Sequence, residues 1–147
     1  MNNPIAGFGA LIGRTLICAI FFLSAAFYKI PKFSHVVEHM TKEGVPLPQF
    51  ALVLTIAMLL VGSVLIIVGF KARIGALLLF VFLAAATFYF HDFWNMNEED
   101  SHVQQIMFMK NLSMLGTMVF IMAVGAGPWS IDNCCCKTEA SETDAAV

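Results

Sequence analysis

Six side chains that could do chemistry lie at the ends of long apolar runs. They are Lys29, His91, Asp92, Trp94, Lys110 and Asn111. An imidazole takes up or releases a proton near neutral pH, and a nearby carboxylate favours its charged form. With the ammonium and amide groups, this set could hold a polar head group, a quinone ring or a small anion. We therefore take the six residues as the candidate ligand-binding site, and no catalytic residue is singled out.

The same residues also fit a simpler description. Aromatic and charged side chains commonly line the boundary between a membrane and water, where they bind no ligand. A binding site requires that the ends of three different runs meet in space. That requirement depends on the elements that position them.

The composition favours a membrane protein. The chain has 147 residues, of which 59% are hydrophobic and 12% charged, and its net charge is −2. A soluble domain is closer to half apolar and a quarter charged, and a short one buries the smallest share of its surface. These values argue against a soluble globular enzyme, a disordered chain and a basic nucleic-acid-binding protein. We expect an all-α integral membrane protein in contact with the lipid bilayer.

Four apolar runs predict four transmembrane helices. A helix needs roughly 20 mostly apolar residues to cross the hydrocarbon core. The runs are continuously apolar, whereas the strands of a membrane barrel alternate. They extend from about Ala6 to Ile30, from Leu47 to Phe70, from Ile74 to Phe90 and from Asn111 to about Val124. The sequence thus predicts a four-helix bundle in one domain, residues 1–132, with no internal repeat.

Three further segments complete this prediction. Residues 31–45 carry apolar side chains at helical spacing, so we expect a short amphipathic helix in the membrane interface between the first two helices. Residues 95–102 contain three acidic side chains and are expected to form a polar loop. Residues 133–147 are expected to be a short, disordered polar tail. Its cysteines, Cys134 to Cys136, form neither a CxxC pair nor a zinc-ligand set, so no metal site is expected.

Four crossings place both termini on one side of the membrane. Arg14, the turn at residues 71–73 and Asp132 share that side, and we expect Arg14 and Asp132 to form a structural ion pair. A short loop with two positive charges is difficult to translocate, so this side is expected to be cytoplasmic. An alternative for residues 15–26 is the core of a cleaved signal peptide, because Arg14 precedes them and small residues end them.

Several short segments, taken in order, resemble the DoxX family of membrane proteins over roughly residues 8–132. Those that carry the resemblance are Gly13-Arg14-Thr15-Leu16, Phe21-Phe22-Leu23-Ser24, Tyr28-Lys29, Gly44-Val45-Pro46, Gly69-Phe70-Lys71-Ala72-Arg73, Phe90-His91-Asp92-Phe93-Trp94, Lys110-Asn111-Leu112 and Ile131-Asp132. No segment is specific alone, and the resemblance depends on their order and spacing. One difference lies at Met58, where many members carry a glutamate. This difference argues against an intramembrane proton or cation site at that level.

The resemblance implies a four-helix protein of the inner membrane, linked to membrane redox and thiol systems. The family takes its name from a subunit associated with a sulfur-oxidising, quinone-linked oxidoreductase. The function expected on this basis is an accessory or quinone-interacting subunit of a membrane redox system. A quinone is then the candidate cofactor and a redox protein the candidate partner. The alternative is a non-enzymatic protein, either a small-molecule permease or a membrane scaffold for a partner protein.

Overall fold

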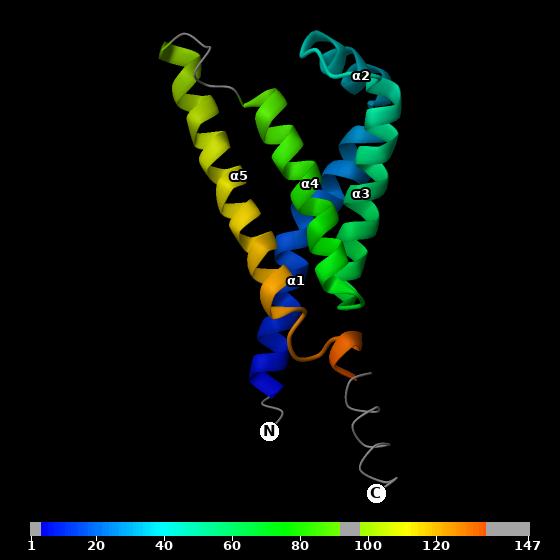
Figure 1. The fold of residues 1–147 in the computed structure, drawn as a ribbon, viewed down its shortest axis with the longest axis vertical. Helices are drawn as coiled ribbons and strands as arrows, with labels where there is room; N and C mark the ends of the chain where they lie inside the picture. The colour runs from blue at the N-terminus through cyan, green and yellow to red at the C-terminus, as the bar shows by residue number, and fades with distance from the viewer. Residues whose placement is uncertain (1–3, 92–97, 135–147) are drawn as a thin grey trace, which may run out of the picture.

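The computed structural model describes residues 4–91 and 98–134, whose regular elements are all helical. The elements, in order, are α1 (Pro4–Leu23), the π-helix η1 (Ser24–Lys29), α2 (Phe33–Lys42), α3 (Pro48–Val68), α4 (Ala72–Phe90) and α5 (Glu98–Val124) (Figure 1). Four stretches are long and apolar enough to cross a membrane: Pro4–Lys29, Pro48–Val68, Ala72–Phe90 and Ser101–Val124. The predicted all-α membrane fold is confirmed.

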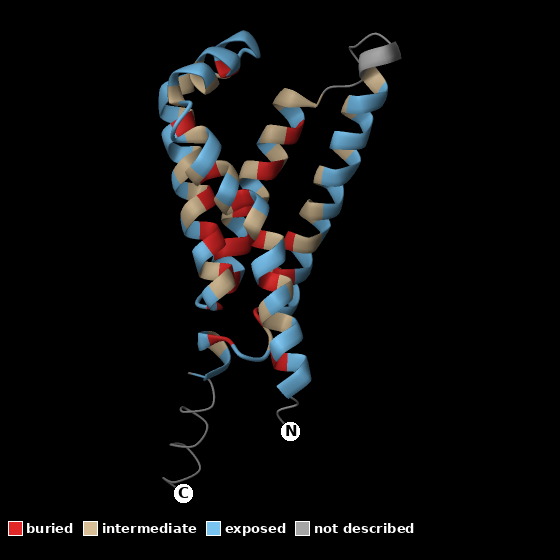
Figure 2. Ribbon diagram, turned by 180° about the vertical axis from the view of Figure 1, so that it is seen from behind, coloured by how far each residue is buried: buried red, intermediate tan, exposed pale blue. Residues whose placement is uncertain are grey.

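The helices pack in an arrangement that is tight at one end and open at the other. α4 contacts both α3 and α5, while α1 packs against α3. The start of α1 and the segment after α5 lie at the lower end of Figure 1, and α2 lies at the upper end. α5 and α4 diverge toward the upper end, whereas buried residues concentrate in the middle and lower parts (Figure 2). The axes of α4 and α5 are therefore farther apart at the upper end than in the middle of the bundle.

A close backbone contact joins α3 and α4. A Cβ atom added to Gly62 would lie 3.0 Å from the carbonyl oxygen of Gly75, and one added to Gly75 would lie 2.8 Å from the carbonyl oxygen of Gly62. Small residues permit such backbone contact, which drives helix association in lipid. This crossing fixes α4 against α3, and α4 carries one wall of the site.

The outward faces of the bundle are strongly apolar. Large side chains such as Leu16, Phe50, Phe88 and Phe120 are more than half exposed. An aqueous surface rarely tolerates so many exposed apolar side chains, whereas a bilayer requires them. Their exposure therefore agrees with contact to lipid around the bundle.

Two expectations about element boundaries need correction. The fourth helix begins at Glu98 and not at Asn111, so the described part of the expected loop, residues 98–102, is helical. Val103, Ile106 and Met107 extend the apolar pattern toward the N-terminus and account for the added turns. The π-helix within the first span was not predicted. Residues 95–97 of the expected loop and 135–147 of the expected tail lie outside the described residues.

The other predicted boundaries agree with the structure. The amphipathic segment between the first two spans forms α2, with Met40 buried toward the bundle. Residues 15–26 belong to α1 and η1, where Cys18, Phe21 and Ala25 contribute to the core. The cleaved-signal alternative for these residues stays a prediction, as does the domain boundary at residue 132.

Candidate functional site

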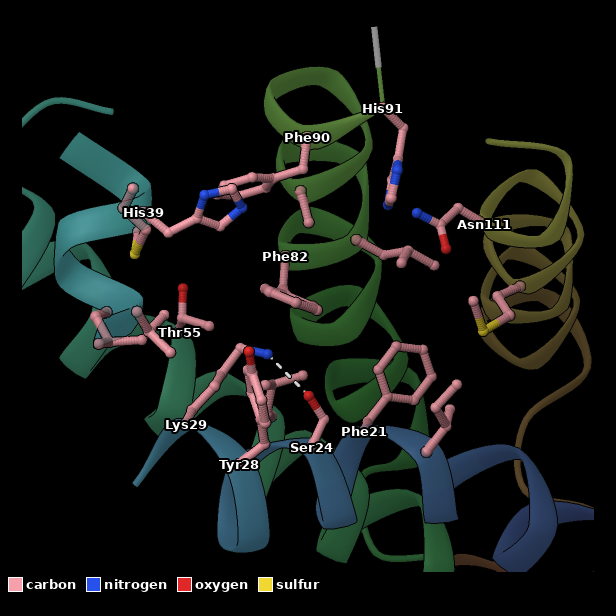
Figure 3. A pocket seen from close by; sticks show the side chains of 18 of the residues that line it. Phe21, Ser24, Tyr28, Lys29, His39, Thr55, Phe82, Phe90, His91 and Asn111 are labelled. Carbon is pink, nitrogen blue, oxygen red and sulfur yellow. Dashed lines mark hydrogen bonds between the residues drawn. The ribbon is translucent and has the colours of Figure 1, made fainter. Parts of the chain in front are cut away.

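A cavity of about 460 Å³ lies at the upper end of the bundle. Such a volume is typical of small-molecule sites. Its walls come from all five α-helices and η1, and most of its lining is apolar or aromatic (Figure 3). The polar residues on its lining are Ser24, Tyr28, Lys29, His35, His39, Thr55, His91, Gln104 and Asn111. A mostly apolar cavity with a few polar groups is the usual form of a ligand site.

Lys29 is positioned by the π-helix. Its Nζ atom donates a hydrogen bond of 2.8 Å to Ser24 Oγ, and it lies 5.6 Å from the centroid of the Phe82 ring. In an α-helix with 3.6 residues per turn, positions five apart would face directions about 140° apart. The π-helix, whose backbone bonds join Ile30 N to Ala25 O, brings the two side chains together. The local backbone therefore directs an ammonium group to the cavity wall.

Polar contacts between α4 and α5 form the second polar part of the wall. His91 ends α4, and its Nδ1 atom lies 2.7 Å from Gln104 Oε1 on α5. Asn111 Nδ2 donates to Thr87 Oγ1 at 3.0 Å, and that hydroxyl donates to the carbonyl oxygen of Leu83 at 2.7 Å. These two bridges hold the diverging helices at a set distance. The side chains of His91, Gln104 and Asn111, which form these bridges, also line the cavity.

α2 forms a further part of the cavity wall. The His39 ring lies 5.2 Å from the Phe90 ring, centroid to centroid, and the rings are tilted by 35°. His35 lies one turn earlier on the same helix and also lines the cavity. On the exposed side of α2, Glu38 accepts a hydrogen bond of 2.8 Å from Lys42, and this contact lowers the pKa of Glu38. α2 thus places His35 and His39 on the cavity lining, whereas its one carboxylate, Glu38, is paired with Lys42 on the exposed side.

The structure brings together three of the six candidate residues. Lys29, His91 and Asn111 line the cavity, although they come from η1, α4 and α5. Lys110 is exposed on α5 and borders a separate shallow hollow. Asp92 and Trp94 lie outside the described residues. The ends of three runs do meet, as the sequence suggested, and a site there stays a prediction.

Sequence reasoning missed several lining residues. His35 and His39 were not among the six candidate residues, although their i, i+4 spacing places them on one side of the expected amphipathic helix. Ser24 and Gln104 gave no signal, because their roles depend on the π-helix and on the early start of α5. Phe82 and Phe90 are ordinary in an apolar run. Only the packing shows that they face the same space.

Arg14 closes the lower end of the bundle. It is 5% exposed, and it donates hydrogen bonds to the carbonyl oxygens of Ala126, at 3.0 Å, and Trp129, at 2.6 Å. Its guanidinium also packs on Gly69, where an added Cβ would collide with it. These contacts tie the segment after α5 to α1 and to the turn between α3 and α4.

Asp132 acts on the same turn by another route. Its two carboxylate oxygens accept hydrogen bonds from the backbone N–H groups of Lys71, at 2.8 Å, and Ala72, at 3.1 Å. It therefore satisfies the free N–H groups at the start of α4. No Arg14–Asp132 ion pair is present among the described residues. The two residues share one end of the bundle, as predicted, but they bind different partners there.

The cavity lining carries several groups that could contact a ligand. Among the described residues no group of three or more histidine, cysteine, aspartate or glutamate side chains could hold a metal ion. The cavity offers ammonium and amide donors, imidazoles that can take up protons, and aromatic faces for a flat or elongated apolar ligand. This chemistry suits an amphiphilic molecule that enters from the membrane.

The four long apolar helices define the chain as an integral membrane protein of the multi-helix type. Comparison with known families finds a match to DoxX over residues 9–92, which is more than half of the sequence. The chain belongs to the DoxX family.

Two relatives from Escherichia coli strain K12 are inner membrane proteins. The chain is 29% identical over 122 residues to inner membrane protein YphA, covering 83% of this chain and 86% of that protein. It is 35% identical over 124 residues to inner membrane protein YqjF, covering 84% and 89%. A shorter alignment matches a Surfeit locus protein 4 homolog from Schizosaccharomyces pombe. The two sequences are 29% identical over 70 residues, which cover 46% of this chain and 23% of that protein. No solved structure matches the chain. These relatives and the four apolar helices place the protein in the inner membrane.

Proposed function

We propose that this protein is an accessory subunit of a membrane redox system and that it binds a quinone in the upper cavity. The observation that carries the proposal is the composition of the cavity wall. Aromatic rings, Phe82 and Phe90 among them, lie beside polar groups of Lys29, His91 and Asn111. A quinone ring has two flat faces for aromatic contact and carbonyl oxygens that accept hydrogen bonds.

The position of the cavity supports a ligand that dissolves in lipid. Its lining includes Ile20 and Tyr28, which are 56% and 47% exposed on the lipid-facing surface of the bundle. An isoprenoid tail could therefore remain in the bilayer while the ring occupies the cavity. Imidazoles on the wall could exchange the protons that accompany quinone reduction, with electrons supplied by a redox partner protein.

The alternative of a small-molecule permease has less support. A permease needs a path that opens on both sides of the membrane, and the contacts of Arg14 close the lower end in this conformation. The scaffold alternative predicts no ligand in the cavity. A binding measurement on the cavity therefore tests the scaffold alternative.

The proposal is tested with purified protein in detergent and the soluble analogue decylubiquinone. His91→Ala and Asn111→Ala each remove one polar group from the wall, so each is expected to weaken binding at least fivefold. His102→Ala is the matched control, because His102 is exposed on α5 and does not line the cavity. Equal affinity in the wild-type protein and all three variants would contradict the proposed site, and so would the absence of binding.

A further inference from the structure

Lys29 is the one lysine on the described lining of the cavity. Its ammonium group has no acidic partner among the described residues. Its ammonium carries three donors, and its one hydrogen bond to a described residue goes to the neutral hydroxyl of Ser24. The remaining contact is with the face of the Phe82 ring. A cation in an apolar, membrane-embedded site is costly unless an opposite charge accompanies it.

None of the carboxylates whose side chains the structure describes forms an ion pair with Lys29. Glu38 is bonded to Lys42 on the exposed side of α2, and Glu43 lies 4.0 Å from His39 Nδ1. Asp132 is at the opposite end of the bundle, where it caps α4. None of the three lines the cavity.

The other ionisable side chains on the lining include no carboxylate. They are the imidazoles of His35, His39 and His91 and the phenol of Tyr28. The described lining of the cavity therefore carries one lysine and no carboxylate. An anionic group on the ligand would supply the charge that Lys29 lacks.

The volume and the lining of the cavity limit the size of the apolar part of the ligand. Below Lys29 the lining becomes apolar, with Phe21, Leu59 and Met114 among its residues. Its volume of about 460 Å³ lies in the lower half of the range for small-molecule sites. Such a space suits one head group and the first part of one chain. The exposed rim at Ile20 gives the rest of that chain a way into the bilayer.

We infer that the cavity also takes a single-chain carboxylate amphiphile, such as a long-chain fatty acid, whose carboxylate pairs with the ammonium of Lys29. Its alkyl chain lies along the apolar wall toward Ile20. This ligand uses the same cavity as the proposed quinone, but its recognition depends on charge and not on ring stacking. The two ligands therefore compete, and the two proposals can fail separately.

The test uses tritiated palmitate bound to the full-length protein in nanodiscs of phosphatidylcholine, at a pH where palmitate is ionised. Unlabelled palmitate is expected to displace the probe at a concentration at least about tenfold lower than 1-hexadecanol, because the alcohol has the same chain without the charge. Lys29→Gln is expected to abolish this preference. Lys42→Gln, which removes an exposed lysine outside the cavity, is expected to keep it.

Three results would overturn the inference. In the wild-type protein, hexadecanol could compete as well as palmitate, which would show that charge is not recognised. Lys29→Gln could keep the preference, which would place the anion elsewhere. Phosphatidylglycerol could displace the probe as well as palmitate does, which would assign the site to a phospholipid head group. The first and third results need no variant, so misfolding of Lys29→Gln cannot obscure them.

Decylubiquinone serves as the second competitor and separates the two proposals. If it displaces palmitate and palmitate keeps its advantage over hexadecanol, both proposals are supported. If it fails to displace palmitate, the quinone proposal is contradicted and the carboxylate inference is not. If decylubiquinone binds by a direct measurement and palmitate does not bind, the carboxylate inference is overturned.

Discussion

The Lys29 ammonium lies 2.8 Å from the Ser24 hydroxyl, five positions earlier in the chain. This contact exists because residues 24–29 form a π-helix and not a further turn of α1. Single π-helical turns within α-helices occur often at functional sites. The unusual backbone of this segment is thus directly connected to the placement of a cation on the cavity wall.

Ser24→Ala should release the Lys29 side chain without unfolding the bundle. We expect the affinity for decylubiquinone to fall about threefold to tenfold, and the free energy of unfolding to change by about 1 kcal/mol or less, because one half-buried hydrogen bond is lost. Titration of ligand and denaturation in mixed micelles measure the two effects. Ser113→Ala is the control, since its hydroxyl donates to the carbonyl oxygen of Met109 on its own helix. Equal losses of affinity in both variants would show that the Ser24 contact is irrelevant.

Arg14→Met should destabilise the protein markedly. The change removes the hydrogen-bond donors to the carbonyl oxygens of Ala126 and Trp129. The hydrogen bond to Ala126 is buried. We expect the free energy of unfolding to fall by about 2–4 kcal/mol. Unfolding in mixed micelles, followed by circular dichroism, measures it. Arg73→Met, which removes an exposed arginine with one long contact of 3.4 Å, should change it far less. A small effect of Arg14→Met would contradict its structural role.

Asp132→Ala should loosen the start of α4. The loss of a side chain that caps a helix N-terminus costs about 1 kcal/mol, with a range of about 0.5–2 kcal/mol. The decrease should appear in the same unfolding measurement, and amide exchange should become faster at Lys71 and Ala72, whose N–H groups lose their acceptor. Asn133→Ala is the neighbouring control. Unchanged exchange at the two amides would exclude the cap.

Gly75→Ala should disturb the crossing of α3 and α4. The added Cβ would lie 2.8 Å from the carbonyl oxygen of Gly62, so the helices must separate. We expect a loss of about 1–3 kcal/mol in the free energy of unfolding. Gly116→Ala provides the comparison, because no heavy atom lies within 4 Å of a Cβ at that position. Equal stability of the two variants would mean that the close crossing is not maintained.

Much of the architecture could be predicted because lipid imposes a strong pattern on sequence. Continuous apolar runs located the four spans, and periodic apolar positions located α2. The start of α5 was misplaced, because polar residues interrupt the apolar positions Val103, Ile106 and Met107 in its first turns and no continuous apolar run forms there. The π-helix could not be predicted from the sequence. Ser24 and Lys29 are five residues apart, and that spacing brings two side chains together in a π-helix but not in an α-helix.

The site was predictable only to the extent that topology places helix ends together. Lys29, His91 and Asn111 could be assigned to one end of the bundle because each ends or begins an apolar run. Whether a side chain faces the cavity depends on rotation about the helix axis, and nearly uniform apolar runs do not encode it. Lys110 and Asn111 illustrate the limit: they are adjacent in sequence, but only Asn111 lines the cavity.

The partners of Arg14 illustrate a second limit. Charge complementarity suggested Asp132, whereas the guanidinium binds backbone carbonyls of the segment after α5. Backbone acceptors are present at every residue, so the sequence carries no signal that selects them. The sequence could predict only that both residues lie at the same end.

The most direct test of a ligand site in the upper cavity is photolabelling with an azido-quinone and mapping of the labelled residues by mass spectrometry. We predict labels within residues 20–29 and 82–91, which decylubiquinone suppresses by competition. Labels that are scattered over the lipid-facing surface and insensitive to decylubiquinone would contradict the proposed site.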